Sequence, residues 1–209
     1  MKSNLLKSLF NKHIKQHLSI TDLSCKNHLL YREVNTGLLK GFCFNSSGFA
    51  ADQFEIVVFV MPLYVPKNFL ALTFGYFLRS PNKRQWWQYE EGKLEQLGQD
   101  LAVVINQADK DLLSKINNAQ DFYNYYKKDR KNTFRFFEAV SYSSAYAGLP
   151  DSTEILKDCL SFIKRKEDLN NSYVQEVYHN TEKLLDGNRK AILDEWEMET
   201  RKALKLLKR

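Results

Sequence analysis

The sequence predicts an α+β protein with an N-terminal helix, a four-stranded, mainly antiparallel sheet, and a helical C-terminal part packed on that sheet. Residues 1–80 contain short β-favouring segments separated by Asn/Gly turn signals. After Ser80-Pro81-Asn82 the apolar residues instead follow a helical period. We therefore expect residues 1–81 to form the first helix and the sheet, and residues 82–209 to form helices that complete one compact unit.

The first eighteen residues predict an amphipathic helix, because apolar and histidine side chains recur at i, i+3 and i+4. His13 and His17 lie four residues apart, so both imidazoles could point the same way, as a metal pair requires. However, HIKQH lacks the glutamate of HExxH, and no third ligand lies nearby in the sequence. We therefore expect no metal site and two histidines that border the helix face.

Four strands are expected near residues 28–34, 38–45, 54–64 and 71–79. Asn35-Thr36-Gly37 follows the first strand and Asn45-Ser46-Ser47-Gly48 follows the second, which is typical of an antiparallel meander. The third strand shows no alternation over residues 56–60, so it should be buried on both faces. Because the first helix can cover only one face, helices from the C-terminal part should cover the other.

Helices are expected over residues 90–106, 108–116, 118–128, 133–147, 151–165 and 172–208. Asp151 is the expected N-cap of the fifth, with Glu154 three residues later completing an approximate capping box. In the last segment Gly187 interrupts the apolar period, so we expect a break or kink there.

The composition, 44% hydrophobic and 27% charged, suits a soluble globular protein with a sizeable core. No uncharged run exceeds 12 residues, against about 20 needed to cross a membrane as a helix. Lysines interrupt the N-terminal apolar residues, so no secretion signal is expected. The widely spaced Cys25, Cys43 and Cys159 are typical of reduced thiols. We expect a cytoplasmic protein that does not enter the membrane.

No strong catalytic pattern occurs in the sequence. Cys25 and His28 could in principle form a nucleophile pair, but such neighbours arise readily by chance. Asp52 and Glu55 flank the third strand as in restriction-like nucleases, yet Val57 stands where the lysine of Glu-x-Lys should be. Neither a Gly-rich phosphate loop nor GxSxG is present. We expect no cofactor and favour a non-enzymatic protein, keeping an unrecognised hydrolase as an alternative.

The tract NKRQWWQYEEGK supplies the candidate binding residues Lys83, Arg84, Trp86, Trp87 and Tyr89. Aromatic side chains beside cations can anchor a protein interface or stack nucleic-acid bases. Adjacent residues point in different directions, so one indole should be buried and the other accessible. The alternative is that the tract fills the seam between sheet and helices. A second aromatic and basic tract, residues 121–137, is better explained by core packing.

The net charge of +6 arises mostly from residues 1–80, which hold 9 basic and 4 acidic side chains. This bias is weaker than the Lys/Arg stripes that follow a phosphate backbone. Nucleic acid is therefore a less favoured partner than another protein.

The leading helix followed by HLLYREV, LLKGFCF, FEIVVFVMPLYVP and LTFGYFL resembles a broad group of uncharacterised bacterial domains, which in turn resemble immunity and antitoxin-associated proteins. The resemblance covers roughly residues 1–80 and rests on the order of elements. Members of this group act by binding and have no established catalytic residues to carry over. The resemblance implies a non-enzymatic bacterial protein that binds another protein as an immunity or antitoxin-like factor.

Overall fold

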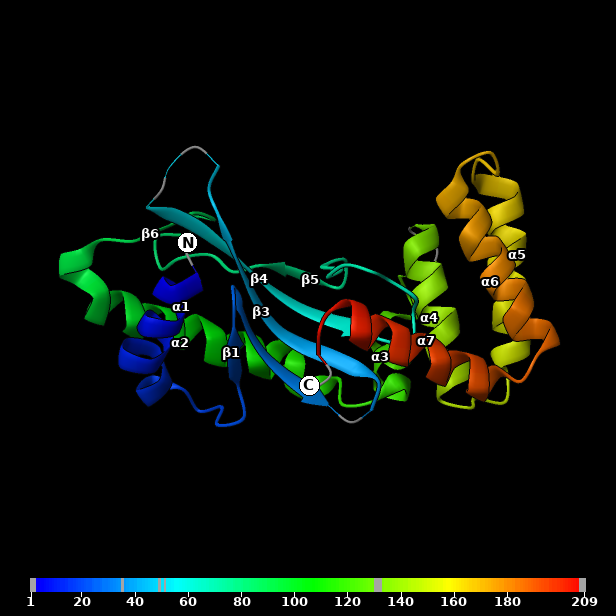
Figure 1. Cartoon of the computed structure of the whole chain (residues 1–209), viewed down its shortest axis with the longest axis horizontal. Coiled ribbons are helices and arrows are strands. Elements are labelled where there is room, and N and C mark those ends of the chain that lie inside the picture. The colour runs from blue at the N-terminus through cyan, green and yellow to red at the C-terminus, as the bar shows by residue number, and fades with distance from the viewer. Residues whose placement is uncertain (1–2, 35, 49, 51, 130–132, 207–209) are drawn as a thin grey trace. The chain divides into compact units, whose positions relative to one another are not determined.

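The computed structural model describes residues 3–34, 36–48, 50, 52–129 and 133–206 (Figure 1). About 53% of the chain is helical and 16% is strand, with a mostly antiparallel sheet, an N-terminal helix and C-terminal helices. These observations confirm the predicted α+β class.

The chain forms two compact units. Unit 1 comprises Met1–Val34, Leu39–Met61 and Ala71–Lys115, and unit 2 comprises Asn35–Leu38, Pro62–Leu70 and Ile116–Arg209. The sequence-based division at residue 81 follows the change of secondary-structure type, whereas these units follow packing. The first long helix of the C-terminal part therefore belongs to the sheet-containing unit.

The sheet of unit 1 has the strand order β1-β2-β3-β4-β5, and β6, which lies off this path, also pairs with β4. Its strands are β1 (Ser24–Lys26), β2 (Leu29–Val34), β3 (Leu38–Ser46), β4 (Gln53–Pro62), β5 (Gly75–Phe77) and β6 (Trp87–Gln88). The four expected strands are present as β2 to β5. The short strands β1 and β6 were missed, because two or three residues show no detectable period.

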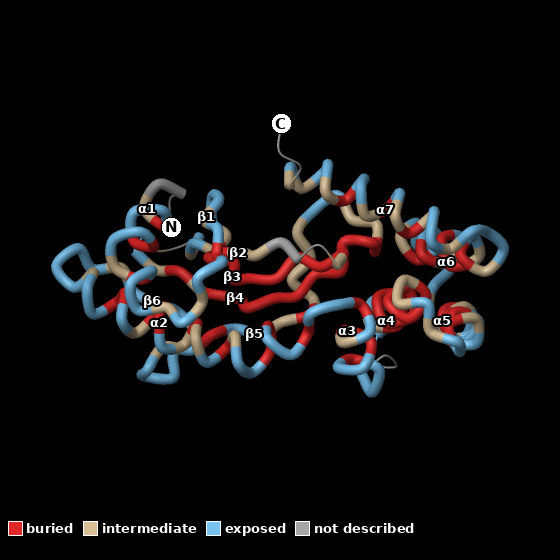
Figure 2. Tube along the Cα trace, turned by 90° about the horizontal axis from the view of Figure 1, so that it is seen from below, coloured by how far each residue is buried: buried red, intermediate tan, exposed pale blue. Residues whose placement is uncertain are grey.

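The strand β4 is the centre of this core. All side chains of residues 56–60 are buried, which confirms the expectation from their unbroken apolar run. Figure 2 shows β3 and β4 buried along most of their length. By contrast, β5 pairs over only three residues instead of the expected 71–79.

The N-terminal segment is helical as expected, but its geometry changes along its length. The α-helix α1 (Ser3–Leu9) is followed by a π-helical turn, η1 (Phe10–Ile14), and a 3₁₀ turn, η2 (Lys15–His17). This segment packs closely on α2 (Leu94–Asp111), because Gly98 has no side chain to keep it away. A Cβ at this position would lie 2.4 Å from the carbonyl oxygen of His13.

Helix α2 continues through residue 107, so the expected boundary between two helices there is wrong. Leu101, Ile105 and Ala108 are buried at helical spacing, so one apolar face of the helix runs without interruption past residue 107. Arg32 of β2 forms an ion pair with Asp109 of α2. The buried Lys40 of β3 donates a hydrogen bond of 2.7 Å to the Leu113 carbonyl oxygen just beyond the helix. These contacts hold α2 against the sheet.

Unit 2 contains the helices α3 (Ala119–Tyr126), α4 (Phe134–Tyr146), α5 (Ser152–Lys166), α6 (Ser172–Asp186) and α7 (Arg189–Ala203). The expected break near Gly187 is confirmed, since this residue follows the last residue of α6. Asp151 occupies the N-cap position of α5 as expected, but its side chain accepts no capping hydrogen bond, so the expected capping interaction is absent. Its φ and ψ of −89° and 5° depart from the extended conformation typical of a side-chain N-cap.

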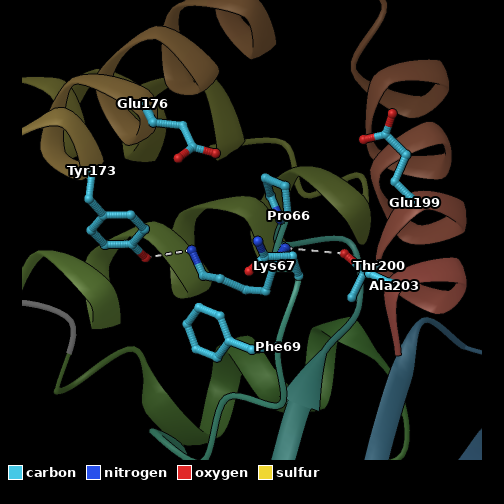
Figure 3. A pocket seen from close by; sticks show the side chains of 9 residues that line it. Pro66, Lys67, Phe69, Tyr173, Glu176, Glu199, Thr200 and Ala203 are labelled. Atoms are coloured by element: carbon cyan, nitrogen blue, oxygen red, sulfur yellow. Dashed lines mark hydrogen bonds between the residues drawn. The ribbon is translucent and has the colours of Figure 1, made fainter. Parts of the chain in front are cut away.

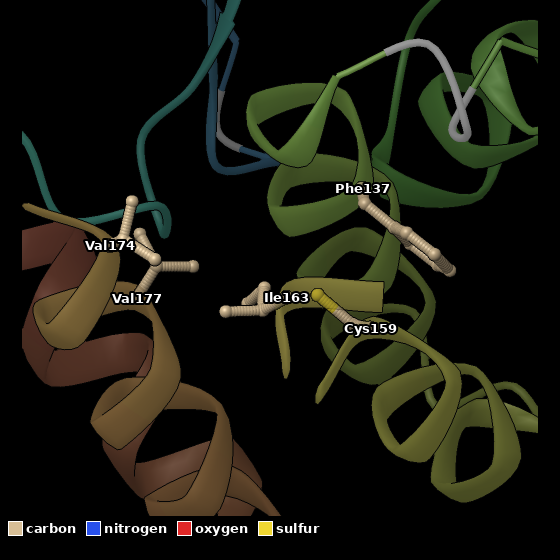
Figure 4. Packing of buried hydrophobic residues seen from close by; sticks show 5 residues of the cluster. All are labelled: Phe137, Cys159, Ile163, Val174 and Val177. Atoms are coloured by element: carbon tan, nitrogen blue, oxygen red, sulfur yellow. The ribbon is translucent and has the colours of Figure 1, made fainter. Parts of the chain in front are cut away.

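Three helices supply the core cluster of unit 2 (Figure 4). Phe137 comes from α4, Cys159 and Ile163 from α5, and Val174 and Val177 from α6. These residues lie on the inner stripes of amphipathic helices, so the helical period predicts their burial. No helix in the described ranges is both long and apolar enough to cross a membrane.

Candidate functional site

The two adjacent tryptophans of the predicted tract have opposite environments. Trp87 of β6 is 3% exposed, its indole stacks on Phe54 with ring centres 6.4 Å apart, and its Nε1 donates to the Leu78 carbonyl oxygen at 3.1 Å. Trp86 is 43% exposed. The expectation of one buried and one accessible indole is therefore confirmed.

A tight turn precedes the tryptophans and presents the two predicted cations to solvent. The Ser80 amide donates to the Arg84 carbonyl oxygen at 2.8 Å, and the Lys83 amide donates to the Ser80 carbonyl oxygen at 2.7 Å. Lys83 has a positive φ of 61°, which lets the chain reverse within these few residues. Both Lys83 and Arg84 are exposed.

A hollow of about 350 Å³ in unit 1 adjoins this turn. Arg84, Trp86 and Trp87 line it together with Glu90 and Lys93, which lie further along the same tract. The Lys93 Nζ and a Glu90 carboxylate oxygen are 2.6 Å apart. The structure thus brings three of the five predicted residues to one hollow.

The remaining two predicted residues do not line this hollow. Lys83 lies in the adjoining turn, and Tyr89 is partly buried, with its amide donating to the Asp52 carbonyl oxygen at 2.7 Å. The exposed Trp86 indole could pack on an apolar side chain of a partner, and Arg84, Lys93 and Glu90 give the hollow charges of both signs.

A second polar site, which no sequence pattern predicted, lies in unit 2 beside the pocket shown in Figure 3. The Lys67 ammonium lies 3.1 and 3.2 Å from the two carboxylate oxygens of Glu138, and it also donates to the Tyr173 hydroxyl. That hydroxyl in turn donates to Glu138 at 3.2 Å. The three residues come from a loop, α4 and α6, and Lys67 is 71 positions from Glu138 in the sequence.

Lys67, Glu138 and Tyr173 form hydrogen bonds with one another. All three hydrogens of the Lys67 ammonium can be used by Glu138 and Tyr173, and the amide of Lys67 donates to Thr200 Oγ1 at 3.3 Å. Burial raises the pKa of Glu138, and Lys67 opposes this rise. Burial, reinforced by Glu138, also raises the pKa of Tyr173. The arrangement is suited to pinning the loop to the helices.

A pocket of about 330 Å³ lies beside this cluster, with the exposed Phe69 and the carboxylates of Glu176 and Glu199 on its lining. The spacing of these residues in the sequence offers no signal for it, because they come from a loop and two separate helices. Glu176, Glu199 and the Phe69 ring attract positive charge, while the ammonium of Lys67, which also lines the pocket, is paired with Glu138.

The histidines considered as metal ligands instead bind a carboxylate. His13 Nδ1 and His17 Nε2 lie 2.9 and 3.3 Å from the two oxygens of Glu95 on α2. Hydrogen bonds from these histidines lower the pKa of Glu95. Across the part of the chain that the structure describes, no group of three or more His, Cys, Asp or Glu side chains is arranged to hold a metal ion.

The three cysteines are free thiols. Burial raises the pKa of Cys25, although Lys7 opposes this effect. Burial also raises the pKa of Cys43 to about 11 and that of Cys159 to about 12. These thiols are therefore protonated at neutral pH and are poor nucleophiles.

No protein-family model matches the chain, and no curated protein or solved structure matches it either. The resemblance to immunity and antitoxin-associated domains stays a prediction.

Proposed function

We propose that this chain is a non-enzymatic bacterial protein of the cytoplasm that binds another protein, as an immunity or antitoxin-like factor. The main support for a binding function is the exposed Trp86 at the hollow of unit 1. The bacterial immunity or antitoxin role rests on the resemblance of residues 1–80.

Trp86 suits an interface anchor because its neighbour is fixed. The Trp87 indole is held by the Leu78 carbonyl oxygen and by Phe54, so the backbone that carries Trp86 is already ordered. Little conformational freedom is then lost when a partner covers the exposed indole. Tryptophans in such positions commonly contribute 2 kcal/mol or more to binding, as estimated from alanine substitution.

The test compares Trp86→Ala with Val103→Ala, a truncation of another exposed apolar side chain in unit 1. Each variant and the wild type would capture proteins from the native host, and the captured protein would then be purified and titrated by calorimetry. We expect Trp86→Ala to weaken binding at least about thirtyfold, because 2 kcal/mol corresponds to that factor, and Val103→Ala to leave it unchanged. Equal affinities for the two variants would contradict the proposal.

A nucleic-acid-associated protein is the second candidate, because Lys83 and Arg84 are exposed beside the exposed indole. Such an arrangement suits a single strand, whose phosphates meet cations while its bases stack. Fluorescence anisotropy with a mixed-sequence single-stranded oligonucleotide at low salt distinguishes the two. No binding at low salt, where phosphate contacts are strongest, eliminates this candidate.

A further inference from the structure

The strand β5 is an edge of the sheet. It pairs with β4 on one side, and no described strand pairs with its other side. Tyr76 and Phe77 are 43% and 45% exposed, and Arg79 just beyond the strand is exposed as well. An exposed edge with unpaired backbone groups is a template for another strand.

The hydrogen-bond pattern determines which backbone groups point to the free side. The Leu78 amide donates to the Ile56 carbonyl oxygen, and the Val60 amide donates to the Phe74 carbonyl oxygen, both at 2.8 Å. Bonded pairs alternate with non-bonded pairs in an antiparallel ladder, and Phe77 lies opposite Val57. The amides and carbonyls of Gly75 and Phe77 therefore point away from β4.

The charges beside this edge select the partner. Arg79, Lys83 and Arg84 are all exposed, and none forms an ion pair with a carboxylate in the described ranges. Arg79 Nη1 donates to the Lys83 carbonyl oxygen at 3.3 Å, which keeps these cations together at the end of β5. A segment with carboxylates complements them.

We infer that β5 binds an extended, acidic segment of a partner protein, which adds to the sheet as a further strand. The backbone of Gly75 and Phe77 supplies the hydrogen bonds, the Phe77 ring packs on the added strand, and the three cations pair with its carboxylates. This inference rests on the proposed protein-binding function and specifies its mode. Main-chain pairing contributes affinity and the side chains contribute specificity, as in other strand additions.

Amide hydrogen exchange with the full chain tests the mode directly. The probe is a synthetic peptide of about ten residues with alternating valine and glutamate, long enough to pair along a whole strand. In the free protein the Leu78 amide should exchange slowly, and the Gly75 and Phe77 amides should exchange fast. At saturating peptide, Gly75 and Phe77 should slow at least about tenfold, because their amides become hydrogen-bonded.

Two substitutions at Phe77 distinguish the contribution of its side chain to peptide affinity from that of its backbone amide. Phe77→Ala removes only the ring, whereas Phe77→Pro also removes the outward amide, and proline is tolerated where an edge amide faces solvent. We expect Phe77→Pro to bind the peptide roughly fivefold more weakly than Phe77→Ala, because it loses about one hydrogen bond to the peptide. Position 75 cannot be used, because any Cβ there would lie 1.9 Å from the Val58 carbonyl oxygen.

The charge variant is Lys83→Asn with Arg84→Gln, because asparagine tolerates the positive φ of Lys83. It should lose about tenfold in affinity for the Val/Glu peptide, and a Val/Lys peptide of equal length should not bind the wild type. If no Val/Glu binding is measurable, or if both peptides bind equally, the acidic segment is the wrong partner. Concentration-dependent dimers that Phe77→Pro abolishes would identify a second copy as the occupant and overturn the inference.

The outcomes also separate this inference from the proposed function. Peptide binding that leaves the Gly75 and Phe77 amides unprotected would overturn strand addition, while loss of the native partner in Trp86→Ala would still support protein binding. If the native partner binds Trp86→Ala as it binds the wild type and these amides become protected by the peptide, the edge is a binding site and Trp86 is not its anchor.

Discussion

Lys67→Met should destabilise unit 2 strongly at neutral pH, because it leaves a buried carboxylate without its counter-charge. The side chain of Glu138 is 2% exposed and that of Lys67 is 11% exposed. After the substitution, Glu138 retains the hydrogen bond from the Tyr173 hydroxyl but loses both contacts to the ammonium. Breaking one side of a buried pair costs about 3–5 kcal/mol, a large part of a typical total of roughly 5–15 kcal/mol.

The penalty should depend on pH in a defined direction. Burial raises the pKa of Glu138, and the charge of Lys67 opposes this rise in the wild type. In Lys67→Met the opposition disappears, so the pKa of Glu138 should rise further. A carboxyl whose pKa is raised by folding contributes stability below its unfolded pKa and loses that contribution as the pH rises through the folded pKa. The variant should therefore approach wild-type stability at acid pH and fall away toward pH 8.

The assay is urea unfolding followed by circular dichroism at about pH 5 and pH 8, within the range where both proteins are folded. The double variant Lys67→Met/Glu138→Leu should recover most of the loss and show little of this pH dependence, because neither charge remains. Lys190→Met is the matched control, since it breaks an exposed pair with Asp194 and should cost at most about 1 kcal/mol.

A Lys67→Met penalty below about 1 kcal/mol, equal at both pH values, would refute the reasoning. It would show that water reaches Glu138 and that the cluster does not pin the loop to the helices.

Three further predictions concern unit 1. Val58→Asp should prevent folding, because an unpaired charge in a fully buried strand costs several kcal/mol; a soluble variant with a cooperative melt would contradict the burial. Trp87→Ala should lower the free energy of unfolding by about 3–5 kcal/mol, whereas Trp86→Ala should change it by at most about 0.5 kcal/mol. Equal losses would indicate that both tryptophans only fill the seam between sheet and helices. Gly98→Ala should cost about 1–3 kcal/mol, because its Cβ would overlap the His13 carbonyl oxygen, and unchanged melting would show that the N-terminal segment can move away.

The local elements were largely predictable because their signals lie within a few neighbouring residues. The unbroken apolar run of residues 56–60 predicted a strand buried on both faces, and Gly187 predicted the boundary between α6 and α7. The contrast between Trp86 and Trp87 followed from the different directions of adjacent side chains. Which of the two is buried could not be predicted, because this depends on the pairing of β6 with β4.

The sequence by itself determined the α+β class, the helical period and the tract that lines the hollow of unit 1. Only the tertiary structure decided that Lys67 meets Glu138 and Tyr173, that His13 and His17 bind Glu95, and that β5 is an edge. Secondary structure is encoded by the spacing of adjacent residues, whereas an ion pair across 71 positions exists only once the chain has packed. No local pattern records which distant segment a buried charge will meet.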